Sequence, residues 1–174
     1  MSALAGDGSA GYGAVASLVP LTEGSAPSRL RYKWRNLWGG LRPAALAKIQ
    51  MDEVATFSVT QMRVADEMSA ALRGLPGITE RSSIVDATAC VGGNTVSFAR
   101  FFGDVVSLEL DKSRAKMLRS NVELCRSELS ETSTPFLGRV EVRCGDCTEV
   151  CAQLPRQAAA SHPPQPSPPQ PVES

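Results

Sequence analysis

An α/β fold built on a partial, doubly wound parallel sheet is predicted by the order of patterns between residues 83 and 144. An apolar, β-branched segment at 83–87 is followed by a glycine turn, a helical pattern and a second β-branched segment at 105–110. Residues 139–144 alternate between polar and apolar side chains and predict a third strand. We therefore expect a partial sheet with strands in the order 3-2-1, preceded by an amino-terminal helical segment.

Composition divides the chain of 174 residues into four regions. Residues 1–28 are mostly Gly, Ala, Ser and Leu without a sustained period, so we expect a disordered arm. Residues 29–80 form a basic, aromatic and helical segment, and residues 81–152 hold the partial sheet. Residues 153–174 are rich in proline, which cannot pair inside a sheet, and are expected to be a disordered tail.

A basic and aromatic stretch opens the helical segment. Its apolar stripe at helical spacing consists of Leu30, Trp34, Leu37 and Leu41. Two interpretations stay open. In the first, an amphipathic helix docks its aromatic side on the domain and leaves its basic side in solvent. In the second, interleaved rings and cations bind RNA, and the residues concerned are Arg31, Lys33, Arg35 and Trp38.

Two further helices have recognisable starts. Thr60 ends a short extended segment at 57–60 and is expected to cap a helix over 61–73. The residues expected on the apolar face of that helix are Val64, Ala65, Met68, Ala71 and Leu72. Asp111 is expected to cap a helix over 112–127, between the second and third strands. The buried stripe expected there consists of Ala115, Leu118, Val122 and Cys125.

Three carboxylates are expected to meet at one edge of the sheet. Asp86, Glu109 and Asp146 stand at the ends of successive strands, and ligands of doubly wound sheets bind outside the carboxyl ends of the strands. The glycine turn at 90–94 adjoins this edge, and backbone without a Cβ atom can approach a ligand closely. An acid at the end of the second strand, here Glu109, suits the hydroxyl groups of a ribose.

The turn departs from the dinucleotide pattern Gly-x-Gly-x-x-Gly, since Ala89 or Cys90 takes the place of its first glycine. Asp86 would also repel a diphosphate. S-adenosylmethionine carries a sulfonium, an α-ammonium and no phosphate, so a carboxylate before the turn favours it. We therefore favour S-adenosylmethionine over a dinucleotide, with a ligand-free Rossmann-like core as a third interpretation.

Composition excludes several other classes of protein. Eighteen basic and eighteen acidic residues balance, so global charge indicates no particular partner. Five cysteines without a secretory signal are typical of reduced intracellular thiols. No stretch approaches the length of a membrane span, and no membrane association is expected. Cys144, Cys147 and Cys151 lack the fourth ligand of a structural zinc site, so no metal is expected.

These motifs resemble the trimethylguanosine synthase family, the RNA cap guanine-N2 methyltransferases. Asp-Ala-Thr-Ala-Cys-Val-Gly-Gly-Asn-Thr at 86–95 is similar to the family's Asp-Ala-Phe-Cys-Gly-Val-Gly-Gly-Asn-Thr. Phe-Ser-Val-Thr at 57–60 and Cys-Gly-Asp at 144–146 match family segments, and Glu-x-Asp at 109–111 stands where the family has Asp-x-Asp. The resemblance extends over about 49–146.

The resemblance implies a Rossmann-like, S-adenosylmethionine-dependent methyltransferase fold. Asp86 and the glycine turn would hold the methionine end, Glu109 the ribose and Asp146 the adenine amine, while a segment before the sheet would cover the site. The cofactor-binding residues implied are Asp86, Gly92, Gly93, Asn94, Glu109, Asp146, Phe57, Ser58 and Thr60. No catalytic residue is identified.

The implied reaction is methyl transfer to the N2 amine of a 7-methylguanosine cap, leading to 2,2,7-trimethylguanosine. The implied partners are capped RNAs of the small nuclear and small nucleolar classes. The implied location is nuclear, with the cytoplasm as the alternative.

Several departures from the family pattern qualify the resemblance, among them that Thr56 replaces a tryptophan and Gln61-Met62 replaces Pro-Glu. Thr88, Ala89 and Cys90 replace Phe-Cys-Gly, and residues 147–174 lack the Pro-Pro-Trp motif that holds the target guanine. Without the strand that carries this motif, the first strand becomes a sheet edge. We therefore expect an amino-terminal portion of a methyltransferase, with a partner or a further segment completing the sheet. The alternative is a catalytically inactive remnant that binds RNA or protein.

Overall fold

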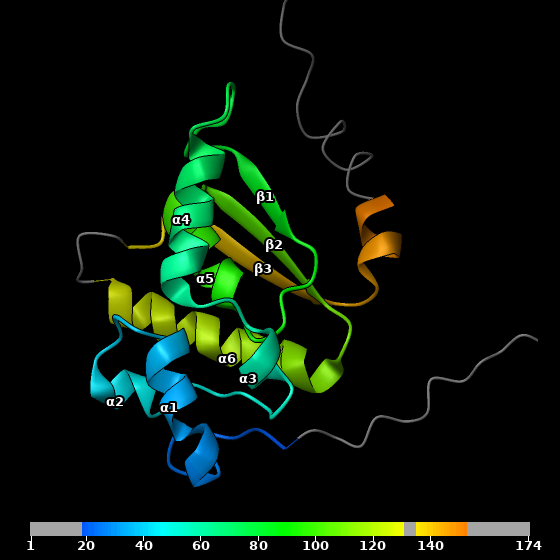
Figure 1. Ribbon diagram of the computed structural model, residues 1–174. Coiled ribbons are helices and arrows are strands. Elements are labelled where there is room, and N and C mark those ends of the chain that lie inside the picture. The colour runs from blue at the N-terminus through cyan, green and yellow to red at the C-terminus, as the bar shows by residue number, and fades with distance from the viewer. Residues whose placement is uncertain (1–18, 131–134, 153–174) are drawn as a thin grey trace, which may run out of the picture.

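The computed structural model describes residues 19–130 and 135–152. Within these residues, three parallel strands form one sheet: β1 (Ser83–Asp86), β2 (Asp104–Glu109) and β3 (Arg139–Cys144), with β2 in the centre (Figure 1). This arrangement confirms the α/β fold and the predicted order of the strands.

Helices precede and separate the strands. Before the sheet come α1 (Ser28–Leu37), α2 (Pro43–Leu46), α3 (Ala55–Ser58) and α4 (Met62–Arg73). The β1–β2 connection is α5 (Gly93–Phe101), and the β2–β3 connection is α6 (Lys112–Leu129). Asp111 caps α6 as predicted, because its side chain accepts a hydrogen bond from the backbone N–H of Arg114.

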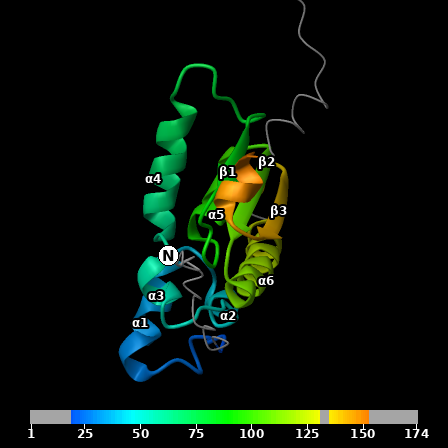
Figure 2. The ribbon, with the colours of Figure 1, turned by 90° about the vertical axis from the view of Figure 1, so that its right-hand side faces the viewer.

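Helices α5 and α6 cover one face of the sheet. Val105 of β2 and Val140 of β3 are register partners, and both pack with Phe98 of α5. The predicted stripe of α6 is buried: Ala115, Leu118, Val122 and Cys125. Helix α4 packs on α5 and stands beside it as an outer layer (Figure 2). This layered packing fixes where the carboxyl ends of the strands lie.

β1 is an edge strand, as the sequence predicts, since among the described strands it pairs only with β2. Ile84 faces the apolar cluster under α5, and Asp86 bonds to Thr95 of the same helix. Val85 points to the opposite face and is 39% exposed. The apolar side chains on both faces of β1 are typical of a parallel strand that is covered on both sides.

Helix α1 docks its aromatic side on the domain, which confirms the first of the two interpretations. Trp34 and Trp38 are fully buried. The indole N–H of Trp34 donates to the carbonyl oxygen of Ile49 at 2.9 Å, and that of Trp38 contacts Sδ of Met51 at 3.3 Å. Both indole N–H groups thus find partners inside the core, as buried tryptophans require.

The prediction that residues 1–28 form a disordered arm is wrong for residues 19–28. The backbones of Leu21 and Met51 exchange two hydrogen bonds, and Ala26 is buried in the cluster that holds the tryptophans. Residues 1–18 of the predicted arm lie outside the described residues. The predicted tail at 153–174 lies outside them as well.

The short segment before α4 is helical rather than extended. Oδ1 of Asp52 accepts the backbone N–H of Ala55 at 2.7 Å and starts the turn α3, which contains Phe57 and Ser58. Gln61, and not Thr60, occupies the N-cap position of α4. The predicted cap was Thr60, although Asp52 stands three residues before Ala55, which is the same spacing by which Asp111 caps α6.

The buried face of α4 differs from the predicted apolar face. Met62, Ala65 and Ser69 are buried against α5, whereas Val64 and Met68 are 37% and 45% exposed. The hydroxyl groups of Ser69 and Ser97 share a 2.8 Å hydrogen bond at this contact. Small side chains allow the two helices to approach closely, so the largest apolar residues of α4 remain outside.

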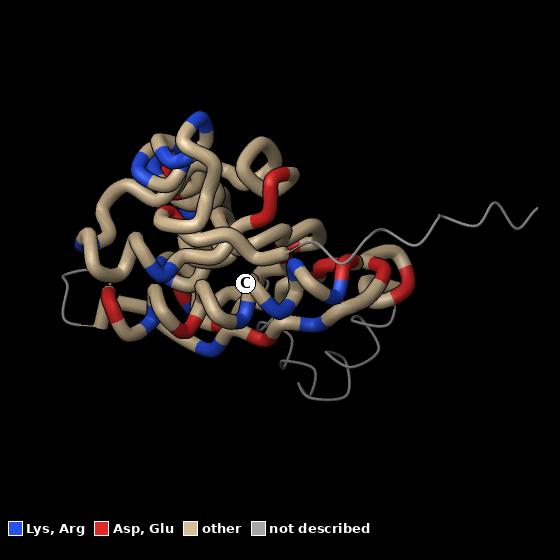
Figure 3. Tube along the Cα trace, turned by 90° about the horizontal axis from the view of Figure 1, so that it is seen from below, with Lys and Arg blue, Asp and Glu red and all other residues tan. Residues whose placement is uncertain are grey.

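Charges of both signs are interspersed along the described chain (Figure 3). Arg42 pairs with Glu128 at 2.6 Å, and Arg63 pairs with Glu67 at 2.6 Å. The described residues contain no helix that combines the length and apolarity needed to cross a membrane. They also contain no group of three or more His, Cys, Asp or Glu side chains arranged to hold a metal ion.

Candidate cofactor site at the carboxyl edge of the sheet

The glycine turn between β1 and α5 adopts a conformation that depends on its glycines. Gly92 has φ of 108°, and a Cβ atom there would lie 2.8 Å from Cδ1 of Leu118. A Cβ atom at Gly93 would overlap the carbonyl oxygen of Thr60. Gly92 therefore provides the left-handed turn, and Gly93 provides room for the protein's own segment at Thr60.

Asp86 is held at the end of β1 by hydroxyl and backbone donors. Its Oδ2 accepts the hydroxyl of Thr95 at 2.6 Å, and that hydroxyl also lies 2.9 Å from the hydroxyl of Ser107. Burial raises the pKa of Asp86 above its ordinary value, while hydrogen bonds from Thr95 and Thr88 act in the opposite direction. Asp86 is thus a buried acid that, among the described residues, is held by hydroxyl and backbone donors and forms no ion pair with a cationic side chain.

Glu109 joins the glycine turn to the start of α6. Its Oε2 accepts the backbone N–H of Cys90 at 2.9 Å, and its Oε1 accepts the backbone N–H of Asp111 at 2.9 Å. Each carboxylate oxygen has two lone pairs, so each oxygen can accept one more donor. The side chain is therefore fixed in orientation and still able to accept the hydroxyls of a ligand.

Asp146 follows β3 and begins a helical turn at 147–152. Its Oδ1 accepts the backbone N–H of Thr148 at 2.8 Å and the hydroxyl of Thr148 at 2.7 Å. These hydrogen bonds hold the pKa of Asp146 below its ordinary value. Both of these bonds fall on Oδ1, and the backbone N–H of Glu149 also lowers the pKa of Asp146. With two lone pairs, Oδ2 can still accept a ligand donor.

A pocket of about 270 Å³ lies between the ends of the strands, and Thr88, Glu109 and Asp146 are among its lining residues. The fold thus brings Glu109 and Asp146 to one cavity. Asp86 is 5% exposed and is not among the lining residues, although its neighbours Ala87 and Thr88 are.

The segment expected to cover the site packs on the glycine turn through Thr60, as the overlap at Gly93 indicates. Phe57 is 69% exposed, and Nζ of Lys33 lies 4.4 Å from the centroid of its ring. Ser58 donates its hydroxyl to the carbonyl oxygen of Val54 at 3.2 Å. Of the three predicted covering residues, Thr60 packs against the glycine turn, and Phe57 faces solvent.

The four residues expected to contact RNA differ in their access to solvent, since Arg31, Lys33 and Arg35 are exposed or half-buried on α1. Trp38 is buried, so a base cannot stack on it, and its assignment to RNA is wrong. Arg31 donates to the carbonyl oxygen of Ala26 at 3.1 Å, and Arg35 pairs with Glu23 at 3.4 Å. Nζ of Lys33 lies over the exposed ring of Phe57, and Arg31 and Arg35 line a pocket together with the exposed Tyr32.

One structural observation indicates that the site residues fit S-adenosylmethionine. Oδ1 of Asn94, in the first turn of α5, is buried and has no hydrogen-bond partner among the described residues. A buried acceptor without a donor costs free energy unless a ligand or water supplies the donor. The α-ammonium group of S-adenosylmethionine is such a donor, and Asp86 supplies negative charge from the same turn region.

Four residues around the site were not identified from the sequence. Thr95 and Ser107 position Asp86, and Asp52 forms a 2.8 Å ion pair with Arg114 beside Glu109. Thr95 ends the motif Gly-Gly-Asn-Thr, so the motif could have identified it as a site residue. The pairing of Asp52 with Arg114 joins positions 62 residues apart, and no local pattern predicts it.

Sheet order, the glycine turn and acids at the ends of successive strands together define a Rossmann-like α/β fold with a candidate ligand site at the carboxyl edge of its sheet. Residues 81–163 match the model of a family described as RNA cap guanine-N2 methyltransferase, which confirms the resemblance over that part of the chain. No curated protein sequence matches the chain.

A solved structure supports the fold. It is the crystal structure of a proposed methyltransferase from Porphyromonas gingivalis W83, which is 15% identical and superposes with a TM-score of 0.52. The alignment covers 76% of this chain and 32% of that protein, so the chain spans about a third of the length of its structural neighbour.

Proposed function

We propose that the chain carries the S-adenosylmethionine site of an RNA methyltransferase that acts on the N2 amine of a 7-methylguanosine cap, leading to 2,2,7-trimethylguanosine. The observation that supports this most is the family match over 81–163, because that range contains the glycine turn and all three strand-end acids. We further propose capped small nuclear and small nucleolar RNAs as partners, and a nuclear location.

The side chains have distinct roles in this proposal. S-adenosylmethionine supplies a methyl group on a positively charged sulfur that an amine can accept. Asp86 and Asn94 hold the cationic methionine end, Glu109 accepts the ribose hydroxyls, and Oδ2 of Asp146 accepts the adenine amine. Since both oxygens of Glu109 are already oriented by backbone donors, the acid is preorganised for the ribose.

Calorimetric titration of the purified chain with S-adenosylmethionine tests the cofactor assignment. We expect Glu109→Gln to weaken binding by a factor corresponding to roughly 1–3 kcal/mol, because a ligand hydroxyl loses a charged acceptor and the amide NH2 cannot accept one of the two backbone N–H groups that orient the acid. Glu67→Gln is the matched control, since Glu67 lies on the exposed face of α4 in an ion pair with Arg63. Equal affinities of the wild-type chain and Glu109→Gln would exclude the assigned site.

Transfer of a labelled methyl group to RNA tests the substrate assignment. The comparison uses two RNAs of identical sequence, one with a 7-methylguanosine cap and one with an unmethylated guanosine cap. Label found on N2 of the 7-methylated cap alone supports the proposal. Cofactor binding without transfer to either RNA favours the inactive RNA- or protein-binding alternative.

A further inference from the structure

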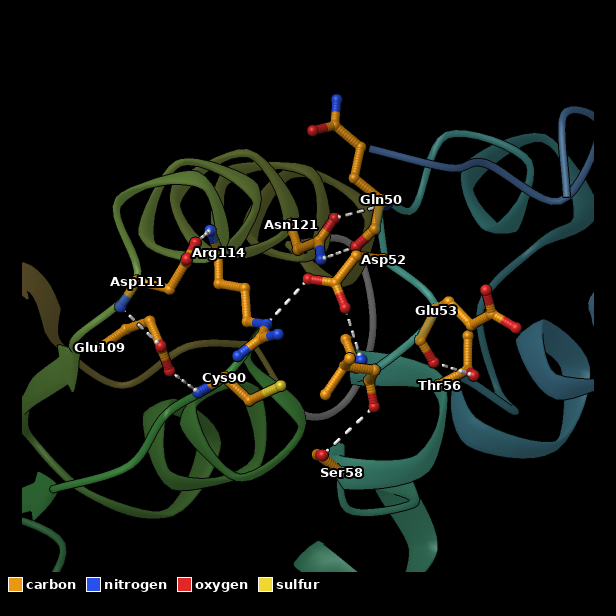
Figure 4. A network of polar contacts seen from close by, with 12 residues as sticks. Gln50, Asp52, Glu53, Thr56, Ser58, Cys90, Glu109, Asp111, Arg114 and Asn121 are labelled. Carbon is orange, nitrogen blue, oxygen red and sulfur yellow. Dashed lines mark hydrogen bonds and ion pairs between the residues drawn. The ribbon is translucent and has the colours of Figure 1, made fainter. Parts of the chain in front are cut away.

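A buried carboxylate lies in the segment that covers the glycine turn. Asp52 is 1% exposed, and both of its oxygens are used: Oδ1 accepts the backbone N–H of Ala55 at 2.7 Å, and Oδ2 accepts Nε of Arg114 at 2.8 Å (Figure 4). The first bond starts the turn α3, and the second fastens this turn to α6. Asp52 thus connects the local shape of the segment to its attachment.

Arg114 extends this connection to the predicted ribose acid. It lies in the first turn of α6, and its backbone N–H donates to Asp111 at 2.8 Å. The backbone N–H of Asp111 donates to Glu109, whose other oxygen accepts the N–H of Cys90. A continuous chain of hydrogen bonds therefore runs from the covering segment to Glu109 and on to the glycine turn (Figure 4).

A second attachment holds the start of the same segment. Asn121 of α6 is fully buried, accepts the backbone N–H of Gln50 at 2.9 Å and donates to the carbonyl oxygen of Gln50 at 2.8 Å. Its amide also donates to the carbonyl oxygen of Val91 in the glycine turn at 3.0 Å. The Asn121 bonds fix Gln50 independently, so the ion pair acts on the part of the segment that follows.

A carboxylate as deeply buried as that of Asp52 requires a cationic or donor-rich partner, because an unpaired buried charge is strongly unfavourable. Its ion pair in the described structure is with Arg114, which is itself mostly buried at this contact. The seating of residues 52–60 against α6 therefore depends on Arg114.

We propose that Asp52 and Arg114 are positioning residues for the cofactor site, which hold the segment carrying Phe57, Ser58 and Thr60 against the glycine turn and Glu109. The inference rests on the proposed function, since it names residues that act on the assigned S-adenosylmethionine site without touching the ligand. The side chain of Arg114 acts through Asp52 on the covering segment, whereas its backbone N–H, which any residue would supply, donates to the cap of α6 beside Glu109.

The test measures the Kd of S-adenosylmethionine for Arg114→Ala and Arg114→Lys at a temperature where each variant is folded. We expect Arg114→Ala to bind on the order of tenfold more weakly, as coupling through a packed network of this size allows. Arg114→Lys restores a cation for Asp52 and is expected to recover most of the affinity. Arg63→Ala, which removes an exposed ion pair on α4, is expected to leave the Kd unchanged.

Amide hydrogen exchange of residues 54–60 gives a second measurement without ligand. Exchange is expected to rise in Arg114→Ala and to stay at the wild-type rate in Arg63→Ala. If Arg114→Ala does not fold, Asp52→Asn replaces it, because Asn keeps an acceptor for Ala55 and loses the charge that Arg114 binds.

A folded Arg114→Ala with wild-type affinity overturns the inference and leaves the proposed function standing. Arg114→Lys binding as weakly as Arg114→Ala overturns it as well, since the cation for Asp52 would then not be what matters. A folded wild-type chain that binds no S-adenosylmethionine overturns the proposed function, and the inference falls with it.

Discussion

Asp86 is buried, and it is also proposed to bind the cationic end of the cofactor. Burial disfavours its charged form in the ligand-free protein, whereas cation binding requires that form. Burial raises the pKa of its carboxyl group in the folded chain. The folded state therefore binds the proton more tightly than the unfolded state does, and ionisation of Asp86 lowers stability. This cost is absent below about pH 4, where both states are protonated, and grows as pH rises toward the folded pKa.

We expect Asp86→Asn to raise the midpoint of thermal unfolding at pH 7.5, because the neutral amide removes the cost of a buried charge. The gain is expected to shrink as pH falls toward about 4, near the ordinary pKa of Asp. The measurement is thermal unfolding of the wild-type chain and the variant between these two pH values. A gain that is constant with pH would show that charge is not its cause.

Cys90 occupies a position of the glycine turn for which its backbone conformation is unfavourable. Its φ is 50°, in the left-handed region that residues with a Cβ atom seldom adopt. The similar family segment has Gly at this place. Burial raises the pKa of the Cys90 thiol to about 11, so the side chain is a neutral thiol at physiological pH.

Substitutions at Cys90 are expected to follow backbone conformation rather than side-chain volume. Cys90→Gly is expected to change the free energy of unfolding by less than about 1 kcal/mol, since relief of the left-handed strain offsets the greater freedom of unfolded glycine. Cys90→Val is expected to cost at least about 1–2 kcal/mol, because a β-branched residue is strained at positive φ. Denaturant unfolding measures both.

The control is Cys125→Val, at a buried helical position of α6 where a β-branched residue has an allowed conformation. We expect it to cost less than Cys90→Val. The reverse order would show that packing, and not the backbone, decides the tolerance of the turn.

At the scale of elements, α1 illustrates why an interleaved basic and aromatic pattern has two interpretations. The pattern has a helical period in either case, and only the position of the core decides which side is buried. Here Trp38 enters the core beside Met51, while Tyr32 remains 57% exposed. The apolar side of α1 is buried by packing. Its basic side stays accessible to solvent while Arg31, Lys33 and Arg35 contact other groups of the chain.

Trp38→Ala is therefore expected to lower the free energy of unfolding by about 3–5 kcal/mol, the usual cost of removing a buried large aromatic side chain. Tyr32→Ala, which truncates an exposed ring on the same helix, is expected to stay within about 0.5 kcal/mol. Chemical denaturation compares the two. A stable Trp38→Ala variant that loses affinity for RNA would return Trp38 to the surface and to an RNA-binding role.

Helix α4 shows a second limit of predicting a buried helix face from the sequence. Val64 and Met68 are the bulky residues that a hydrophobic pattern selects, but the buried hydroxyl groups of Ser69 and Ser97 meet at the contact with α5. Asp66 adds a 2.8 Å ion pair with Arg100 across the same contact. Because small and polar side chains mediate this helix pair, apolar periodicity misplaces the buried face by about one residue.

For the whole molecule, strand order and the strand ends follow from patterns that are local in the sequence. The strand periods, the glycine turn and Asp111 as the cap of α6 predict three parallel strands with acids at one edge, and the sheet has that arrangement. A parallel sheet places its carboxyl ends together for any sequence that forms it, so convergence of Glu109 and Asp146 required only correct strands.

By itself, then, the sequence determined the sheet, the order of its strands and the acids at its edge, because strand and cap signals act within a few residues of one another. Only the tertiary structure decided that Trp38 is core, that Thr60 packs on Gly93, and that Asp52 pairs with Arg114. These outcomes depend on which segments meet after the chain has closed long loops. Close packing and the pairing of buried charges determine which segments come into contact, and neither produces a periodic pattern in the sequence.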